Sequence, residues 1–180
     1  MVELEFRTAT REDVDAVVDL VESAYRGPAS RRGWTTEAGL LEGQRVDRDM
    51  LLEVLDRPAT EVVLAHRDGA LVGCCELERP DRPGGAVHLG MFAVDPEQQG
   101  GGLGHGVLRH AERRAVEWGA GSVELSVIEQ RSELIAWYER RGYLPTGRRE
   151  EFPYGDERFG RPVRDDLRFV VLAKRLDPDG

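Results

Sequence analysis

Residues 86–118 read AVHLGMFAVDPEQQGGGLGHGVLRHAERRAVEW, and this stretch decides the fold. The segment 86–94 is almost wholly apolar and rich in β-branched and aromatic residues, which predicts a strand buried on both faces. Asp95 and Pro96 end this strand, because proline cannot donate to a β-ladder. Beyond a glycine-rich loop, apolar residues recur at helical spacing and predict a helix with one apolar face: Leu103, Val107, Leu108, Ala111, Ala115 and Trp118.

Glycine occupies four of the five positions from 100 to 104, at the expected start of that helix. Each glycine costs a helix about 0.8–1 kcal/mol relative to alanine, so the cluster needs a reason. A helix N-terminus offers free N–H groups and a positive dipole end, and glycines let an anion approach them closely. We therefore expect a phosphate-bearing ligand here; the alternative is a flexible turn before a poorly capped helix.

The loop excludes two common phosphate-binding motifs. Residues 100–106 do not contain G-x-G-x-x-G, and a P-loop needs a lysine, whereas the only lysine of the chain is Lys174. What remains is QGGGLG at 99–104, a Q-x-x-G-x-G pattern after Val-Asp-Pro. Here the chain resembles the GCN5-related N-acetyltransferase (GNAT) family, whose pyrophosphate loop is [QR]-x-x-G-x-[GA]. The resemblance implies acetyl-CoA as co-substrate, with cofactor contacts from Gln99, Gly100, Gly101, Gly102, Leu103, Gly104 and His105.

The rest of the chain predicts a single mixed α/β (α+β) domain over residues 1–180. We expect strands at 3–8, 61–67, 70–78, 122–128, from 143 and at 167–176, and helices near 14–25, 46–55 and 131–141. Asp68-Gly69 predicts a tight hairpin turn, and the segments 26–45 and 152–166 are long connections. This order predicts a mostly antiparallel, twisted sheet of about seven strands flanked by about four helices, which is also the GNAT element order.

A second resemblance lies at Ala136-Trp137-Tyr138-Glu139-Arg140-Arg141-Gly142-Tyr143, whose last six residues are similar to the Y-E-[KR]-x-G-[FY] part of the family's A-x-x-Y-E-[KR]-x-G-[FY]. It implies that Tyr138 protonates or hydrogen-bonds the departing sulfur; the alternative is a buried helix tyrosine without a catalytic role. Many members carry an asparagine seven residues earlier. Here that position is Arg131, which we expect to meet a cofactor phosphate instead.

Two residues are candidates for the base that accepts the amine proton. The resemblance points to His88 on the central strand, and histidine suits the role because its unperturbed pKa of about 6.5 lies near neutral pH. The alternatives are Glu76 on the preceding strand, or a histidine without function. Gly90 inside this strand favours a β-bulge or a close backbone approach, and the alternative is that a large side chain would not fit there. The family has a bulge in this strand, and by resemblance the backbone of Phe92, Ala93 and Val94 would line the pantetheine arm of the cofactor.

Composition limits the remaining function classes. A net charge of −9 argues against a nucleic-acid surface. The chain shows neither a signal-peptide-like start nor the ~18 apolar residues of a membrane span. Cys74 and Cys75 are adjacent and would point to opposite faces of a strand, so we expect no disulfide, no metal site and a cytoplasmic setting.

These observations predict a cytoplasmic, acetyl-CoA-dependent N-acetyltransferase that moves an acetyl group directly to a primary amine of a small molecule or peptide. The alternative is a non-catalytic acyl-CoA-binding or sensing module on the same fold. We expect no nucleic-acid or membrane partner, and a homodimer is left open. The resemblance implies that the acceptor enters between 26–45 and 152–166. Carboxylates and aromatics in these segments favour a cationic amine (Trp34, Glu37, Glu42, Phe152, Tyr154, Asp156, Glu157, Phe159, Asp165 and Asp166). Arginines there leave a mixed charge, and the alternative is that both segments are ordinary solvated loops.

Overall fold

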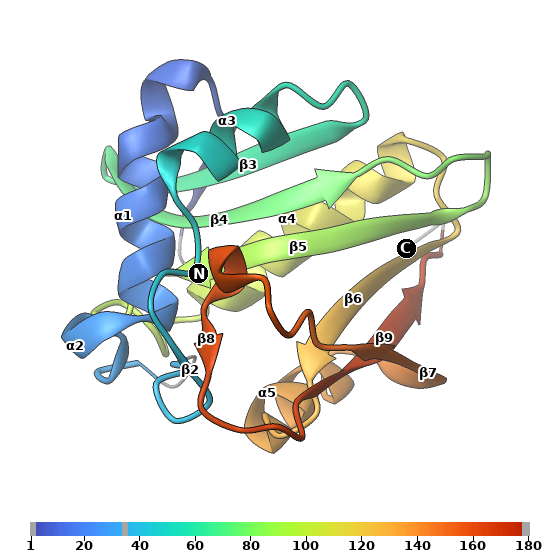
Figure 1. Cartoon of the computed structure of the whole chain (residues 1–180). Helices are drawn as coiled ribbons and strands as arrows, with labels where there is room; N and C mark the ends of the chain where they lie inside the picture. The colour runs from blue at the N-terminus through green and yellow to red at the C-terminus, as the bar shows by residue number, and fades with distance from the viewer. Residues whose placement is uncertain (1–2, 34–35, 178–180) are drawn as a thin grey trace.

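The computed structural model describes residues 3–33 and 36–177. These residues form a twisted seven-stranded sheet in the order β1-β3-β4-β5-β6-β9-β7, together with a two-stranded ribbon of β2 and β8 (Figure 1). All neighbouring strands of the large sheet are antiparallel except β5 and β6. The expected mixed, mostly antiparallel α/β fold is therefore confirmed.

The strands of the large sheet lie close to the predicted ranges. They are β1 (Glu5–Thr8), β3 (Thr60–Arg67), β4 (Ala70–Glu78), β5 (Ala86–Val94), β6 (Ser122–Ile128), β7 (Leu144–Glu151) and β9 (Arg168–Arg175). Between β3 and β4, Asp68 and Gly69 both have positive φ (52° and 79°), which is the backbone of a type I′ hairpin turn. The predicted hairpin is thus confirmed.

Helices cover both faces of the sheet. On one face α1 (Val14–Tyr25) and α3 (Arg48–Leu55) bury their apolar sides against β3 and β4. On the other face lie α4 (Leu103–Glu117) and α5 (Ser132–Glu139). None of the helices in the described residues has the length and apolar character that a membrane crossing requires.

The two long connections contain short elements that the sequence did not predict. The first holds α2 (Gly27–Ser30) and β2 (Leu41–Glu42), and the second holds the 3₁₀ turn η2 (Glu157–Phe159) and β8 (Arg161–Pro162). Pairing of β2 with β8 joins the two connections into one cover over the sheet (Figure 1). A side chain at Gly160 would begin 2.9 Å from Nη2 of Arg26, so only glycine fits where the two connections meet.

The central feature is a split between β5 and β6. The parallel ladder joins Ala86–His88 to Ser122–Glu124 and does not continue beyond them. Figure 1 shows the two strands diverging after this point. Between Gly90 and Ala93, β5 also carries an extra residue relative to β4, so the predicted bulge is present. Its left-handed residue is Met91, with φ of 43°, rather than Gly90.

Candidate active site

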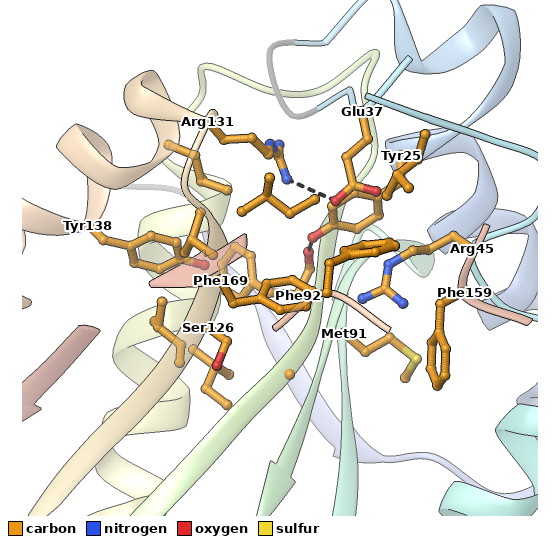
Figure 2. Close-up of a pocket in the computed structure, with 18 of the residues that line it drawn as sticks. Tyr25, Glu37, Arg45, Met91, Phe92, Ser126, Arg131, Tyr138, Phe159 and Phe169 are labelled. Carbon is orange, nitrogen blue, oxygen red and sulfur yellow. Dashed lines mark hydrogen bonds and ion pairs between the residues drawn. The ribbon is translucent and has the colours of Figure 1, made fainter. Parts of the chain in front are cut away.

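A cleft of about 290 Å³ occupies the split between the diverging strands. Its walls are residues 88–92 of β5 and 125–128 of β6, and the cover formed by 26–45 and 152–162 contributes Glu37, Phe152 and Phe159. Figure 2 shows side chains from all of these segments converging on one space. The same cleft is reached by Tyr138 of α5 and Tyr25 of α1.

A second cavity, of about 200 Å³, lies at the glycine-rich loop. Gly102 is the N-cap of α4 and has φ of 79°, and no side chain caps the helix. A side chain at Gly100 or Gly102 would meet open space, so the free N–H groups of the first helical turn are approachable. This geometry fits an anion at the start of α4, as the sequence predicted.

Residues Gln99, Gly104 and His105 of this loop make different contacts. Gln99 donates a hydrogen bond through Nε2 to the carbonyl of Val94 at 3.1 Å, which ties the loop to the end of β5. Gly104 packs against Trp137, since a side chain there would begin 3.3 Å from the indole ring. His105 lines the cavity, and burial together with Arg141 and Arg109 lowers its pKa.

Sequence reasoning missed Arg141 as a site residue. Its guanidinium stacks on Trp137 at 3.7 Å from the ring centroid, and it lines the glycine-loop cavity. Its Nε is buried without a hydrogen-bond partner among the described residues. A buried, unpaired donor beside a helix N-terminus fits a phosphate group. The second motif carried no signal for it, because Arg141 falls on the position before Gly142 that the motif leaves open.

A hydrogen bond from a side chain of α1 holds the backbone at the bulge. The hydroxyl of Tyr25 donates a hydrogen bond to the carbonyl of Phe92, and Tyr25 is buried. Phe92 and Val94 line the glycine-loop cavity, and Phe92 also lines the cleft. Ala93 is buried and packs in the core on the α1 side, so its side chain reaches neither cavity. A cofactor contact from Ala93 therefore remains a prediction for its backbone alone.

Tyr138 stands where the cleft and the glycine-loop cavity meet, since it lines both. Its ring packs edge-on against Phe92, Trp137 and Tyr143. Burial raises the pKa of its hydroxyl well above the ordinary value, so the group stays protonated at neutral pH and can act as a proton donor.

Glu76 and His88 lie on the same face of the sheet, on neighbouring strands. In the antiparallel pairing of β4 with β5, Glu76 lies opposite Gly90. His88 lies opposite Glu78, two residues further along each strand. Glu76 is mostly buried, and that burial raises the pKa of its carboxyl, although Arg57 at 3.7 Å and His88 counteract the shift. His88 is exposed. It lines both the cleft and a third cavity, of about 400 Å³, that contains Glu76.

Arg131 is not at the glycine loop. Its side chain is 8% exposed and lies in the cleft, where Nη1 is 3.4 Å from Oε1 of Glu37. The other oxygen of Glu37 pairs with Arg26, whose side chain is 5% exposed. One buried carboxylate therefore serves two buried guanidinium groups (Figure 2 draws the Arg131 pair). A phosphate contact from Arg131 remains a prediction, but the structure places this residue with the cleft.

The carboxylates that favoured a cationic acceptor do not line the cleft. Asp156 caps η2, and Asp166 pairs with Arg164 at the surface. Glu42, Glu157 and Asp165 are exposed. Of the expected residues Glu37, Phe152 and Phe159 do line it, whereas Tyr154 binds the backbone of Leu167 and Trp34 lies outside the described residues. Apart from Glu37, the carboxylates of these two segments therefore form no acidic lining of the cleft within the described residues.

The sequence matches a known family over most of its length. The model of the acetyltransferase (GNAT) family matches residues 16–143, which include the bulged strand, the glycine-rich loop and Tyr138. The chain belongs to the GNAT acetyltransferase family. The predicted membership is confirmed, and the matched residues of this GNAT domain include β5 and β6, between which the cleft lies.

Individual relatives agree with this assignment. The S-(2-succino)cysteine N-acetyltransferase of Bacillus subtilis (strain 168) is 27% identical over 151 residues, covering 81% of this chain and 87% of that protein. An amino-acid acetyltransferase of Pseudomonas putida KT2440 is 29% identical over 141 residues, 78% of this chain. The chain spans about 28% of the length of that relative.

Solved structures share the fold. The ribosomal-protein-S18-alanine N-acetyltransferase of Escherichia coli superimposes with a TM-score of 0.71, covering 97% of this chain and 95% of that one, at 16% identity. At this identity the likeness concerns the GNAT fold alone.

Proposed function

We propose that this GNAT protein transfers the acetyl group of acetyl-CoA directly to a primary amine of a small molecule or peptide. The observation that carries the proposal is the position of Tyr138, a buried proton donor shared by the cavity at the α4 N-terminus and by the cleft at the β5 bulge. Of the two relatives named above, the one from Bacillus subtilis is an N-acetyltransferase and the one from Pseudomonas putida is an amino-acid acetyltransferase. Both names support a small amine as acceptor.

The residues around the glycine loop fit acetyl-CoA. The pyrophosphate would accept hydrogen bonds from the first turn of α4 at Gly102–Gly104, with Arg141 as a charged donor beside it. Next to this cavity lies a basic wall of Arg109, Arg140 and Lys174. Glu112 lines it too and pairs with Lys174, and the positive charge that remains suits further negative charge on the ligand. The pantetheine arm would then run along the backbone of β5 toward the bulge.

The same geometry supports a proposal for the two proton transfers. Glu76 accepts the proton that the amine loses as its nitrogen bonds to the thioester carbon, and Tyr138 donates a proton to the sulfur as the carbon–sulfur bond breaks. The products are the N-acetylated amine and CoA with a free thiol. Glu76 is the stronger base candidate because its carboxyl lies against Gly90, where the bulge begins, and its raised pKa suits proton acceptance. His88 lines the same cavity as Glu76 and would relay the proton through water.

A screen of amines for release of the free CoA thiol tests the proposal, with acetyl-CoA binding followed separately by calorimetry. Cys74 and Cys75 are buried and should not react with the thiol reagent in the folded protein. Acetyl-CoA binding together with amine-dependent thiol release supports the enzyme. Binding without release to any amine would instead favour the alternative of a non-catalytic acyl-CoA-binding module.

A further inference from the structure

We infer that the acceptor carries a carboxylate next to its amine, as an amino acid does, and that Arg45 binds this carboxylate with support from Arg131. The inference rests on the proposed acetyl transfer and assigns the acceptor class of the same cleft. It replaces the cationic acceptor that the sequence had favoured.

The cleft is positively charged although the chain carries a net charge of −9. Its walls contain Arg45, Arg131 and His88, and Glu37 is the only acidic residue lining it among the described residues. Glu37 is already shared by Arg26 and Arg131, so these three buried groups together keep one positive charge. Buried charge is costly unless it is compensated, so an anionic ligand would be stabilised here.

Arg45 adds a second positive charge, which also acts on the carboxyl of Glu76 and lowers its pKa. It is half-buried and forms no ion pair within residues 3–33 and 36–177. Its guanidinium lies 5.5 Å from the centroid of the Tyr25 ring, and the guanidinium of Arg131 lies 5.7 Å from the same centroid. Figure 2 shows Arg45 reaching toward Phe92 and Met91, into the cleft. Its planar fork of donors matches a carboxylate.

The geometry favours an anion other than the cofactor phosphates as the ligand of this charge. Neither Arg45 nor Arg131 lines the glycine-loop cavity, and neither lines the basic wall beside it. Arg45 instead lines the cleft and the cavity that contains Glu76. An acceptor carboxylate bound to Arg45 would thus place an adjacent amine beside Met91 and the candidate base.

Paired acceptors test the inference. Each amino acid is compared with its own amide, which keeps the α-amine but has no carboxylate, in wild type, Arg45→Gln, Arg45→Lys and the control Arg48→Gln. Arg48 is exposed, pairs with Asp15 and lines none of these cavities. Because an amide lowers the basicity of the α-amine, more of it is the reactive neutral form, so a preference for the acid cannot come from amine protonation.

We expect kcat/KM of wild type to favour the best amino acid over its amide by about 10- to 100-fold, the range of a hydrogen-bonded charge pair. Arg45→Gln should abolish that preference mainly through KM, with acetyl-CoA affinity unchanged, whereas Arg45→Lys should keep part of it and Arg48→Gln all of it. Amides that match or exceed their acids in wild type, or an acid preference that survives Arg45→Gln, would overturn the inference.

A binding measurement separates this inference from the proposed function. If no amine is acetylated, calorimetry with an N-acetyl amino acid and its amide still reports on the cleft. Stronger binding of the acid, lost in Arg45→Gln, would retain the carboxylate site while the enzyme proposal fails. Equal or absent binding of both probes would reject the carboxylate site as well.

Discussion

The carboxylate of Glu76 lies against the backbone of Gly90, at the point where the β5 bulge begins. The two residues are paired across β4 and β5, and a side chain at Gly90 would begin 3.7 Å from Oε2 of Glu76. A side chain at Gly90 would therefore stand in van der Waals contact with the candidate base. This relationship leads to a prediction about pH dependence.

If Glu76 is the base, kcat/KM should fall as pH drops through its pKa, because the protonated carboxyl cannot accept a proton. Burial raises that pKa, so this acidic limb should lie above the ordinary value of 4.5. Arg57 lowers the pKa and Glu78 raises it, so Arg57→Gln should move the limb to higher pH and Glu78→Gln to lower pH. Both shifts should be small, since Arg57 is 54% exposed and therefore screened.

The pH–rate profile of Glu76→Gln decides between the two base candidates. Glu76→Gln should lose this limb and about 10²–10⁴-fold in rate. If the limb instead survives Glu76→Gln and vanishes in His88→Ala, the role belongs to His88.

Tyr138→Phe should lower kcat by about 10²–10⁴-fold with little change in acetyl-CoA affinity, because it removes a proton donor and keeps the packed ring. Tyr143→Phe is the matched control. Tyr143 is also buried and its hydroxyl donates to Glu112 at 3.1 Å, but it lines neither the cleft nor the glycine-loop cavity. Steady-state kinetics that showed equal losses in both variants would argue for a packing effect and against acid catalysis.

Gly102→Glu should weaken acetyl-CoA binding by about 2 kcal/mol or more, because it places a negative charge where the pyrophosphate would meet the helix N-terminus. Gly147→Glu controls for backbone strain: Gly147 lies in β7 with φ of 83°, close to the 79° of Gly102, and a side chain at either position meets open space. Calorimetry should show a loss in Gly102→Glu alone. Similar affinities of the two variants would remove the loop from the binding site.

Glu37→Gln should destabilise the fold by about 3–5 kcal/mol, because it leaves the guanidinium groups of Arg26 and Arg131 buried without their shared carboxylate. Glu42→Gln, at an exposed position of the same connection, should change stability by no more than about 0.5 kcal/mol. Urea unfolding of both variants measures the difference. If Glu37→Gln were as stable as wild type, the ion pairs of Glu37 with Arg26 and Arg131 would not be an energetically coupled unit.

Local sequence patterns were sufficient to predict the large sheet and its main helices. Alternation and apolar runs located the strands of the large sheet, and Asp68-Gly69 and the glycine loop marked turns whose backbone demands those residues. Two-residue strands such as β2 and β8 carry no periodic signal, so the cover over the cleft could not be predicted. Its pairing depends on contacts between residues about 120 positions apart in the sequence, as Leu41 and Pro162 show.

The site was predictable where a motif fixed the geometry, as at Gly102 and Tyr138, and not where charge pairing decides. A sequence shows that the segments 26–45 and 152–166 contain both acids and arginines. It does not show that Glu37 turns inward to meet Arg131 while Asp156 and Asp166 remain at the surface. The sign of the charge in the cleft therefore emerged only from the folded arrangement.

Acetyl-CoA labelled with ¹³C in its acetyl group provides the most direct test of the proposed function. The protein is incubated with this substrate and a mixture of amino acids and other amines, and the products are identified by mass spectrometry. The proposed function predicts that the labelled acetyl group appears as an amide on an amine nitrogen, with an equal amount of free CoA thiol, and that Tyr138→Phe slows both together. Acetyl-CoA that remains intact, or that is hydrolysed to labelled acetate without any N-acetylated product, would contradict it.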